Sequence, residues 1–381
     1  MSEQTTPSDV PPTPARTRVA VVFGGRSSEH GISCVTAGSV LAALDRDRYD
    51  VVLVGIARDG RWVLQSDDAS RLAITGNALP EVDGSGRAVS LVGAGDVTEL
   101  VVNSPSSVPE VLGQVDVVLP LLHGPWGEDG TLQGLLEMAG VRYVGSGVLA
   151  SAVGMDKVYM KQALAAAGLG VTPGLVVTRR EWQQDPEQAA ARVAELGYPV
   201  FTKPPRSGSS IGISRVEGPE GLAAAMELAL EHDAKVLVEI AMEGAREIEC
   251  AVLGTFDGGA ETSLPGEVVT GGEHTFYDFE AKYLADQETR IDIPARIEEH
   301  LVAEIRAQAA RAFQALGCEG LARVDFFVMP DGSVVVNEIN TMPGFTPTSM
   351  YPQMWAATGL PYRDLVDRLL RLALERDTGL R

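Results

Sequence analysis

The segment RVDFFVMPDGSVVVNEIN, residues 323–340, constrains the fold most strongly, because it predicts a β-hairpin that carries an unusual pair of acids. Runs rich in Val, Phe and Ile flank the Asp-Gly dipeptide at 331–332, and Asp-Gly is a strong signal for a two-residue hairpin loop. A hairpin with these two loop residues places Asp325 directly opposite Glu338.

The two predicted acids need a positive charge close to them. Directly opposed residues of an antiparallel pair have Cβ atoms about 5 Å apart, where two carboxylates repel each other. Alternation along the strands puts Arg323 and Asn340 on the same face as the acids. Carboxylate and amide oxygens are ligands that Mg²⁺ prefers, often beside substrate phosphates. The hairpin therefore predicts either a divalent-metal site or an edge hairpin with a solvated acidic face.

Length and charge limit the kinds of protein that the chain can be. Its 381 residues exceed the size of about 250–300 at which a single core stops growing, so two or three domains are expected. The net charge of -21 argues against a nucleic-acid or anionic-membrane partner, because such surfaces demand clustered cations. No run of 18 apolar residues and no apolar leader occurs. We expect a cytoplasmic protein with a disordered tail over residues 1–17.

The pattern of apolar residues predicts a mixed fold, in which α/β organisation is followed by antiparallel α+β organisation. The chain begins with a buried strand, a helix and a second buried strand. The segment 58–114 is rich in Gly, Ser, Asp and Pro, and predicts small strands and loops added to the first domain. Further helices are expected over 155–167, 295–316 and 363–376.

Lysine is rare in this chain, with five Lys among the 31 basic residues. Lys157, Lys203 and Lys282 fall in motif-like stretches of an acidic chain, as expected for groups that bind the anionic oxygens of a nucleotide. The segment TKPPRSGSSIGIS, residues 202–214, is a loop whose small residues leave backbone N–H groups free to approach phosphate. It is not a Walker A loop, because no Lys-Ser/Thr follows its glycines. A Ser/Gly surface loop remains the alternative.

Two polar motifs follow predicted strands of the first domain. They are GGRSSEHGIS with Glu29 and LLHGPWGEDG with His123. In open α/β sheets ligands bind beyond the carboxyl ends of strands, so both motifs are candidates for a ligand site. The simpler explanations are that Glu29 favours the dipole of the following helix and that His123 is a packed residue. The GSGVLA stretch at 145–150 matches a dinucleotide motif, but the acid expected about 20 residues later is missing.

Taken together, the motifs resemble those of the ATP-grasp ligases, and most closely the D-alanine–D-alanine ligase family. The resemblance runs from about Arg18 to the last predicted helix. It is carried, in the family order, by GGRSSEHGIS, LLHGPWGEDG, GSGVLASAVGMDK, KPPRSGSSIGIS, VLVEIAMEGAREIEC, TFYDFEAKY, ARVDFF and NEINTMPGFTPTSMYP.

The resemblance implies a three-domain ATP-grasp architecture. An N-terminal open parallel-sheet domain over 18–144 is expected on the first-substrate side. A central subdomain over 145–242 and a C-terminal domain over 243–381, both built of antiparallel sheet and helices, would clasp ATP. The family also implies a cytoplasmic homodimer that makes D-alanyl-D-alanine for peptidoglycan.

The resemblance also assigns roles to residues. Two Mg²⁺ or Mn²⁺ ions are expected on Asp325, Glu338 and Asn340. ATP is expected to contact Lys157, Lys203, Ser210, Glu239, Met242, Glu247 and Lys282. Glu29, linked through Ser209 and Tyr283, would hold the ammonium of the first D-alanine, and His123 would lie near its carboxylate. Arg323 and the backbone of Gly344 would meet the oxyanion, and Ser349 and Met350 the carboxylate of the second D-alanine.

One departure and two alternatives accompany the resemblance. His30-Gly31 stands where Arg-Glu is frequent in the first motif, which puts the packing at the helix start in question. The alternatives are an ATP-grasp ligase for another carboxylate and amine, and a non-catalytic nucleotide-binding regulator. Glu29, Tyr283 and the GFTPTSM segment favour alanine, and the presence of all three predicted metal ligands favours catalysis.

Overall fold

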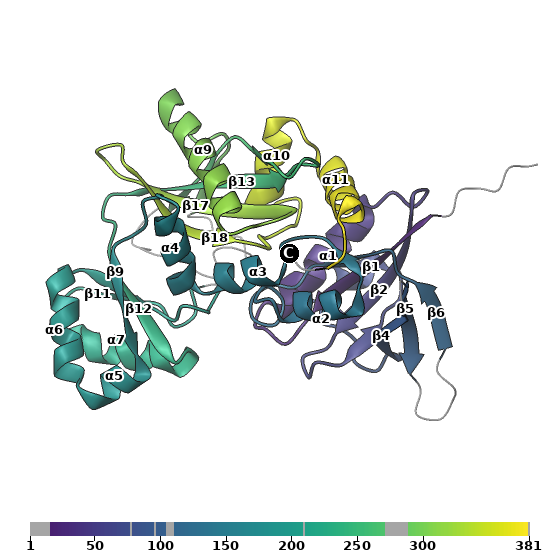
Figure 1. Cartoon of the computed structure of the whole chain (residues 1–381), viewed down its shortest axis with the longest axis horizontal. Helices are drawn as coiled ribbons and strands as arrows, with labels where there is room; N and C mark the ends of the chain where they lie inside the picture. The colour runs from purple at the N-terminus through teal and green to yellow at the C-terminus, as the bar shows by residue number, and fades with distance from the viewer. Residues whose placement is uncertain are drawn as a thin grey trace, which may run out of the picture.

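The structure of the chain is a computed structural model, which describes residues 16–379 apart from 77, 95–96, 104–109, 209 and 271–288. Three β-sheets organise the described residues, of eight, four and six strands, and the six of the third sheet include one short strand that lies off its main path. The N-terminal and central sheets lie at opposite ends of the molecule, and the C-terminal sheet lies between them along the upper side of Figure 1.

The N-terminal sheet is mixed, with the strand order β6-β5-β4-β3-β2-β1-β7-β8. Its strands are β1 (Thr17–Gly24), β2 (Tyr49–Ile56), β3 (Trp62–Leu64), β4 (Ala88–Ala94), β5 (Val97–Asn103), β6 (Glu110–Gln114), β7 (Val117–Pro120) and β8 (Arg142–Tyr143). The expected open parallel sheet is present in β2-β1-β7-β8. The segment 58–114 adds the antiparallel strands β3 to β6 to it, which confirms the prediction of small strands added to the first domain.

Burial on both faces explains the continuous apolar run of β1. Val19, Val21 and Phe23 belong to one core with helix α1 (His30–Ala43), and Ala20 and Val22 belong to another with helix α2 (Thr131–Ala139). Strands of parallel sheets that are covered on both faces read as unbroken apolar segments. The 3-10 helix η1 (Ala69–Leu72) packs against α1.

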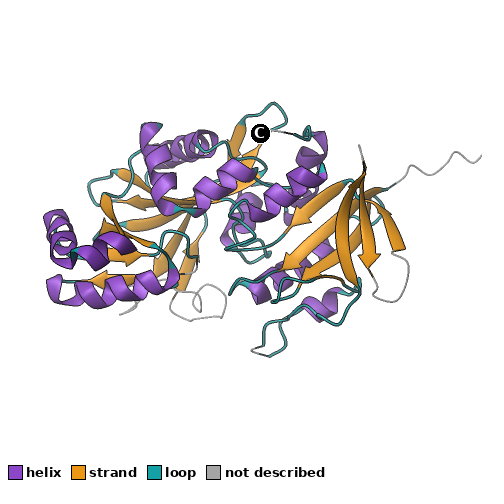
Figure 2. Ribbon diagram, turned by 60° about the horizontal axis from the view of Figure 1, so that its bottom comes forward, coloured by secondary structure: helices purple, strands orange, loops and turns teal. Residues whose placement is uncertain are grey.

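The central sheet has the antiparallel order β11-β10-β12-β9. Its strands are β9 (Gly174–Thr178), β10 (Val200–Lys203), β11 (Ser214–Val216) and β12 (Lys235–Ile240), and its helices are α5 (Arg179–Gln184), α6 (Pro186–Leu196) and α7 (Pro219–His232). Val200 and Val238 pack against these helices, while Phe201 pairs with Glu239 on the opposite face. Figure 2 shows the helices gathered on one side of this sheet. The alternation leaves a polar face free to line a site.

The C-terminal sheet has the order β16-β15-β13-β17-β18, with β14 paired to β13. Its strands are β13 (Arg246–Gly254), β14 (Ala260–Thr262), β15 (Gly266–Thr270), β16 (Thr289–Asp292), β17 (Leu321–Val328) and β18 (Val334–Asn340). Helix α9 (Glu299–Ala315) covers one face, and α10 (Met350–Thr358) and α11 (Tyr362–Glu375) join this sheet to the core around β1. The expected helix over 295–316 thus begins at Glu299.

Two short helices connect the sheets. The predicted helix over 155–167 is observed as α4 (Lys157–Ala166), and α3 (Val148–Met155) precedes it. Asp156 separates them, because its carboxylate caps α4 by accepting a hydrogen bond from the Val158 N–H at 3.1 Å. Figure 1 shows both helices crossing the middle of the molecule.

The hairpin of β17 and β18 confirms the predicted acid pair but not the predicted loop. Asp325 pairs with Glu338 and Arg323 with Asn340. The loop has three residues, since Met329 and Ser333 close it and Gly332 adopts a φ of 86°. A β-bulge between Asp325 and Phe326 compensates for the extra loop residue.

Candidate active site

A cavity of about 520 Å³ is lined by residues of the central and C-terminal domains and by residues from loops of the N-terminal domain. Most of the predicted site residues that the structure describes line it. They are Glu29, His123, Lys157, Lys203, Ser210, Met242, Glu247, Arg323, Asp325, Glu338, Asn340 and Gly344.

The remaining predicted residues fall into two groups. Glu239, Ser349 and Met350 are described but do not line the cavity. Glu239 pairs with Lys203, whereas Ser349 directly precedes α10 without a side-chain capping hydrogen bond and the Met350 side chain is packed in the core. Ser209, Lys282 and Tyr283 lie outside the described residues.

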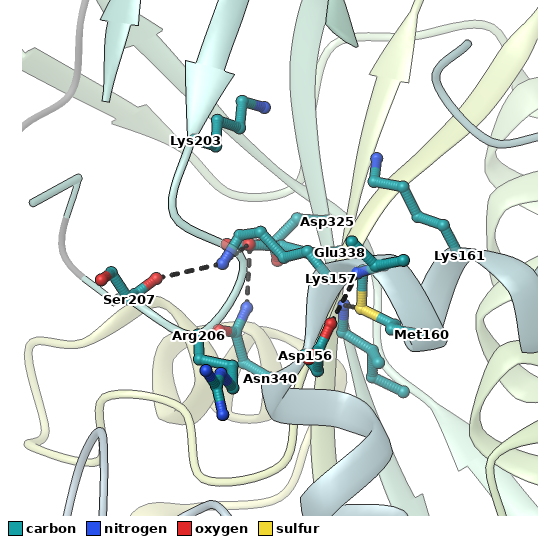
Figure 3. A network of polar contacts seen from close by, with 12 residues as sticks. Asp156, Lys157, Met160, Lys161, Lys203, Arg206, Ser207, Asp325, Glu338 and Asn340 are labelled. Carbon is teal, nitrogen blue, oxygen red and sulfur yellow. Dashed lines mark hydrogen bonds and ion pairs between the residues drawn. The ribbon is translucent and has the colours of Figure 1, made fainter. Parts of the chain in front are cut away.

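The acid pair is embedded in a network of charge-assisted hydrogen bonds. Arg323 donates to both oxygens of Asp325, from Nε and from Nη2, at 2.7 Å each. Asn340 donates from Nδ2 to Asp325 Oδ2 at 3.0 Å, and Lys157 Nζ lies 3.0 Å from Glu338 Oε2. Figure 3 shows Asp325, Glu338 and Asn340 brought together beside Lys157. The two carboxylates are therefore compensated by cations from β17 and α4.

Glu249 is a site residue that the motifs did not single out. It pairs with Asp325 in the neighbouring strand β13, and its Oε2 lies 3.0 Å from Arg323 Nε. Arg323 thus lies between two carboxylates, which together raise its pKa well above the usual value although burial opposes the charge. The sequence did contain a signal, because Glu249 follows Glu247 at the period-two spacing of one strand face.

The chemistry of the donor set fits a divalent ion. Asp325, Glu338 and Asn340 present hard oxygen donors on one face of one hairpin, and they line the cavity together. Among the described residues no group of three or more His, Cys, Asp or Glu side chains is placed to hold a metal. An ion here would need further oxygens from a ligand, as Mg²⁺ commonly takes from phosphates.

Lysines from two elements face this part of the cavity. Lys157, at the start of α4, donates to the Ser207 carbonyl at 3.3 Å as well as pairing with Glu338. Burial disfavours its charge, but Glu338 together with Glu239 and Glu128 outweighs burial, and the pKa of Lys157 is raised. Lys203 ends β10 and pairs with Glu239 at 2.8 Å. Both ammonium groups are therefore held by carboxylates when no anionic ligand is present.

The Gly-Ser loop borders the cavity close to Glu29. Ser210 has a φ of 60° in this loop, a left-handed conformation that few non-glycine residues adopt. A Cβ built on Gly208 would lie 3.4 Å from Glu29 Oε2, and one on Gly124 would lie 2.8 Å from the same atom. Glycine at both positions lets the backbone approach the Glu29 carboxylate.

The N-terminal end of the cavity holds an acid-rich pocket around His123. His123 Nδ1 donates to the Met342 carbonyl at 3.1 Å, and burial lowers the pKa of the imidazole. Its Nε2 is buried without a hydrogen-bond partner among the described residues. Glu128, which the motifs did not single out, accepts from the Gly124 N–H at 2.6 Å, and burial together with Glu29 raises its pKa to about 8.

His30 explains the departure from the common first motif. Its Nδ1 donates to the Gly25 carbonyl at 2.6 Å and its Nε2 accepts from the Val82 N–H at 3.1 Å. A Cβ on the next residue, Gly31, would lie 2.6 Å from Leu79 Cβ. His30-Gly31 therefore holds part of the segment 58–114 against the loop that carries Glu29.

Comparison with known proteins gives a consistent result. Residues 18–146 match the model of the D-ala D-ala ligase N-terminus and residues 148–371 that of the D-ala D-ala ligase C-terminus. The chain is 57% identical to the D-alanine–D-alanine ligase of Arthrobacter sp. (strain FB24) over 100% of both chains. It is 60% identical to that of Kineococcus radiotolerans, over 96% of this chain and 98% of the relative.

Solved structures agree with the sequence matches. The D-alanine-D-alanine ligase from Coxiella burnetii is similar with a TM-score of 0.78 and 33% identity, covering 95% of this chain and 94% of the other. The VanG D-Ala:D-Ser ligase from Enterococcus faecalis is similar with a TM-score of 0.79 and 35% identity, covering 94% and 100%. The chain belongs to the D-alanine–D-alanine ligase family.

Proposed function

We propose that the protein joins two D-alanine molecules to D-alanyl-D-alanine at the expense of ATP, for synthesis of the peptidoglycan precursor of the cell wall. One observation carries the proposal. The two lysines predicted to bind phosphate, the two opposed acids, and the residues Glu29 and His123 all line the same cavity. Identity of 57% over the whole length of a D-alanine–D-alanine ligase supports the same reaction.

The reaction consists of two transfers. A carboxylate oxygen of the first D-alanine attacks the γ-phosphorus of ATP, ADP leaves, and D-alanyl phosphate forms. The amine of the second D-alanine then attacks the acyl carbon, a proton leaves the nitrogen, and phosphate departs. The first step brings a carboxylate to a polyanion, so cationic groups must offset the repulsion. The second develops a negative oxygen, which fixed donors stabilise.

Lysines supply the positive charge for the nucleotide. Lys157 and Lys203 line the cavity and would exchange their carboxylate partners for phosphate oxygens. Lys282 and the loop residue Ser210 complete the predicted phosphate contacts. Met242 and Glu247, which line the cavity together with the strand end at Ile240, would meet adenine and ribose, with Glu239 behind them.

Asp325, Glu338 and Asn340 would hold two Mg²⁺ or Mn²⁺ ions. When bound, such ions neutralise phosphate charge and orient the γ-phosphoryl group for in-line transfer. Arg323 donates to both oxygens of Asp325. In this proposal a metal ion on Asp325 would weaken that pairing, which would free the Arg323 guanidinium for the oxyanion, together with the Gly344 N–H.

Two separate sets of residues would bind the two D-alanine molecules. Glu29, with Ser209 and Tyr283, would bind the ammonium of the first D-alanine, and His123 would lie near its carboxylate. Ser349 and the Met350 N–H lie at the N-terminus of α10, where exposed N–H groups favour the carboxylate of the second D-alanine. The packed Met350 side chain fixes that backbone.

The domain boundaries at 18–144, 145–242 and 243–381 belong to the same proposal. The three sheets and the junction between the two family matches at 146–148 support them. No helix of the described residues has the length and apolarity needed to cross a bilayer. The family relationship supports a cytoplasmic homodimer.

Release of phosphate from ATP tests the reaction. We expect release that requires D-alanine and Mg²⁺ and that L-alanine does not support. Absence of D-alanine-dependent release would overturn the proposal. Because the similar VanG protein is a D-Ala:D-Ser ligase, D-serine and D-lactate should be offered as second substrates. Preferential formation of a mixed product would favour the rival ligase for a different second substrate.

A further inference from the structure

Glu239 is a buried carboxylate shared by two lysines. Its side chain is 1% exposed, its Oε1 lies 2.6 Å from Lys161 Nζ, and its Oε2 lies 2.8 Å from Lys203 Nζ. Each oxygen therefore has its own cation. The two lysines outweigh the cost of burial, so the pKa of Glu239 is lowered.

The two lysines differ in what else they can reach. Lys203 lines the cavity, whereas Lys161 and Glu239 do not. Lys161 lies one helical turn after Lys157 on α4, and its side chain is 8% exposed. Figure 3 shows the ammonium ends of Lys161 and Lys203 pointing toward one another from α4 and from β10. Lys203 can turn to a ligand in the cavity, while Lys161 is confined behind it.

The arrangement poses a charge problem for nucleotide binding. If Lys203 turns to phosphate oxygens, Glu239 loses one of its two counter-ions in a buried setting. Removing the partner of a buried ion is strongly unfavourable, because the remaining charge has been desolvated without compensation. A second cation that stays beside Glu239 when Lys203 turns away would remove this penalty.

We propose that Lys161 is a positioning residue that keeps Glu239 compensated, so that Lys203 is released to bind the anionic phosphates of the nucleotide. The inference rests on the proposed function of Lys203 as a phosphate ligand. Lys161 itself does not contact the nucleotide in this account. It acts on ATP affinity only through Glu239.

The chain offers a matched control for a merely structural role. Lys235 on β12 pairs with Asp156 at the start of α4 at 2.8 Å, and its side chain is 18% exposed. This pair joins the same two elements as Lys161–Glu239 but contains no residue that lines the cavity. Lys235→Met should therefore lower the melting temperature without changing ATP affinity more than about twofold.

The experiment is a double-mutant cycle on ATP affinity, measured by calorimetry with Mg²⁺ and without D-alanine. Lys161→Met should weaken ATP binding roughly tenfold in the wild-type background, within the range found for coupled residues in contact. In the Glu239→Gln background the same change should have less than about a twofold effect, because no carboxylate remains to retain Lys203. Lys161→Arg, which keeps the charge, should bind ATP nearly as well as the wild type.

Equal effects of Lys161→Met in both backgrounds, or an effect no larger than that of Lys235→Met, would overturn the inference. If Lys161→Met does not fold, Lys161→Gln takes its place in the cycle, with a smaller loss expected in the same direction. A wild-type protein that binds ATP but releases no phosphate with D-alanine would contradict the proposed function and leave this test intact.

Discussion

At the scale of single residues, the cavity is defined by charges that compensate one another before any ligand is bound. Arg323 lies between Asp325 and Glu249, Lys157 pairs with Glu338, and similar pairing holds Lys203. A highly acidic chain can thus present a site for a polyanion, because the acids around Arg323, Lys157 and Lys203 are matched by these local cations. In the proposed function, nucleotide and metal would replace these partners without exposing an uncompensated charge.

Glu338→Gln tests the role of the acid pair. The change keeps the shape of the side chain but removes a metal-binding charge, so the Mg²⁺ concentration for half-maximal activity should rise. Loss of several kcal/mol of charge stabilisation corresponds to a fall of about 10²- to 10³-fold in turnover. The measurement is a Mg²⁺ titration of D-alanine-dependent phosphate release.

Glu267→Gln is the control for this change, because Glu267 lies in the same sheet, paired with Arg246, and does not line the cavity. It should lower stability with little effect on the Mg²⁺ requirement. An unchanged Mg²⁺ requirement in Glu338→Gln would count against a metal role for this carboxylate.

His30 predicts a pH dependence of stability. Burial lowers the pKa of His30 in the folded state below the usual value of about 6.5, so between these pKa values the unfolded chain binds more protons. The contribution of His30 is therefore complete above about pH 6.5 and is lost as the pH falls toward the folded-state pKa. His30→Gln should lose less stability than the wild type between pH 7 and the onset of acid unfolding, measured as free energy of unfolding in urea.

The comparison between the two proteins isolates His30, since His123 and Glu128, whose pKa values are also shifted, titrate in both. Parallel stability curves across this pH range would contradict the prediction.

At the scale of elements, the β17–β18 hairpin was predicted correctly in its acid pair but not in its loop. The Asp-Gly signal predicts a two-residue loop, whereas the loop has three residues. The bulge at Asn337 restores the predicted pairing of Asp325 with Glu338. The spacing of the buried residues indicates the bulge. Val336 and Ile339 are both buried but three residues apart, which alternation alone does not permit.

Insertion of one alanine after Asn337 tests the register of the site. Unless the strand absorbs the added residue, a one-residue shift turns Glu338 and Asn340 toward the α9 core or Val334 and Val336 toward the cavity. Either outcome buries charge or exposes apolar surface, so we expect loss of activity and a destabilisation of about 2–4 kcal/mol. Asn337→Ala, which keeps the register, should retain Mg²⁺-dependent activity. Comparable activity in the two variants would rule out a role for this register in setting the site.

Other contacts of the site join separate elements, and the sequence pattern within one element did not predict them. Glu249 reaches Arg323 through the register of β13 on β17, and Lys161 reaches Glu239 because α4 packs beside β12. Spacing along one strand or helix indicates which face a residue occupies. It does not indicate which strand from elsewhere in the chain will lie next to it.

At the scale of the whole molecule, three sheets place the site where chemistry can be kept from water. The N-terminal sheet supplies Glu29 and His123 from loops at the carboxyl ends of β1 and β7, as expected for an open α/β sheet. The central and C-terminal sheets supply the lysines and the acid pair. The segment 58–114 was predicted as small added strands, but the extent to which it continues the sheet depends on long-range pairing.

The central claim is that the opposed acids hold divalent ions that carry the phosphates of the nucleotide. It is tested most directly by anomalous scattering from crystals grown with ADP and Mn²⁺. The account predicts manganese peaks about 2.0–2.3 Å from oxygens of Asp325, Glu338 and Asn340, in contact with the diphosphate. A diphosphate bound elsewhere, with no manganese peak between Asp325 and Glu338, would contradict it.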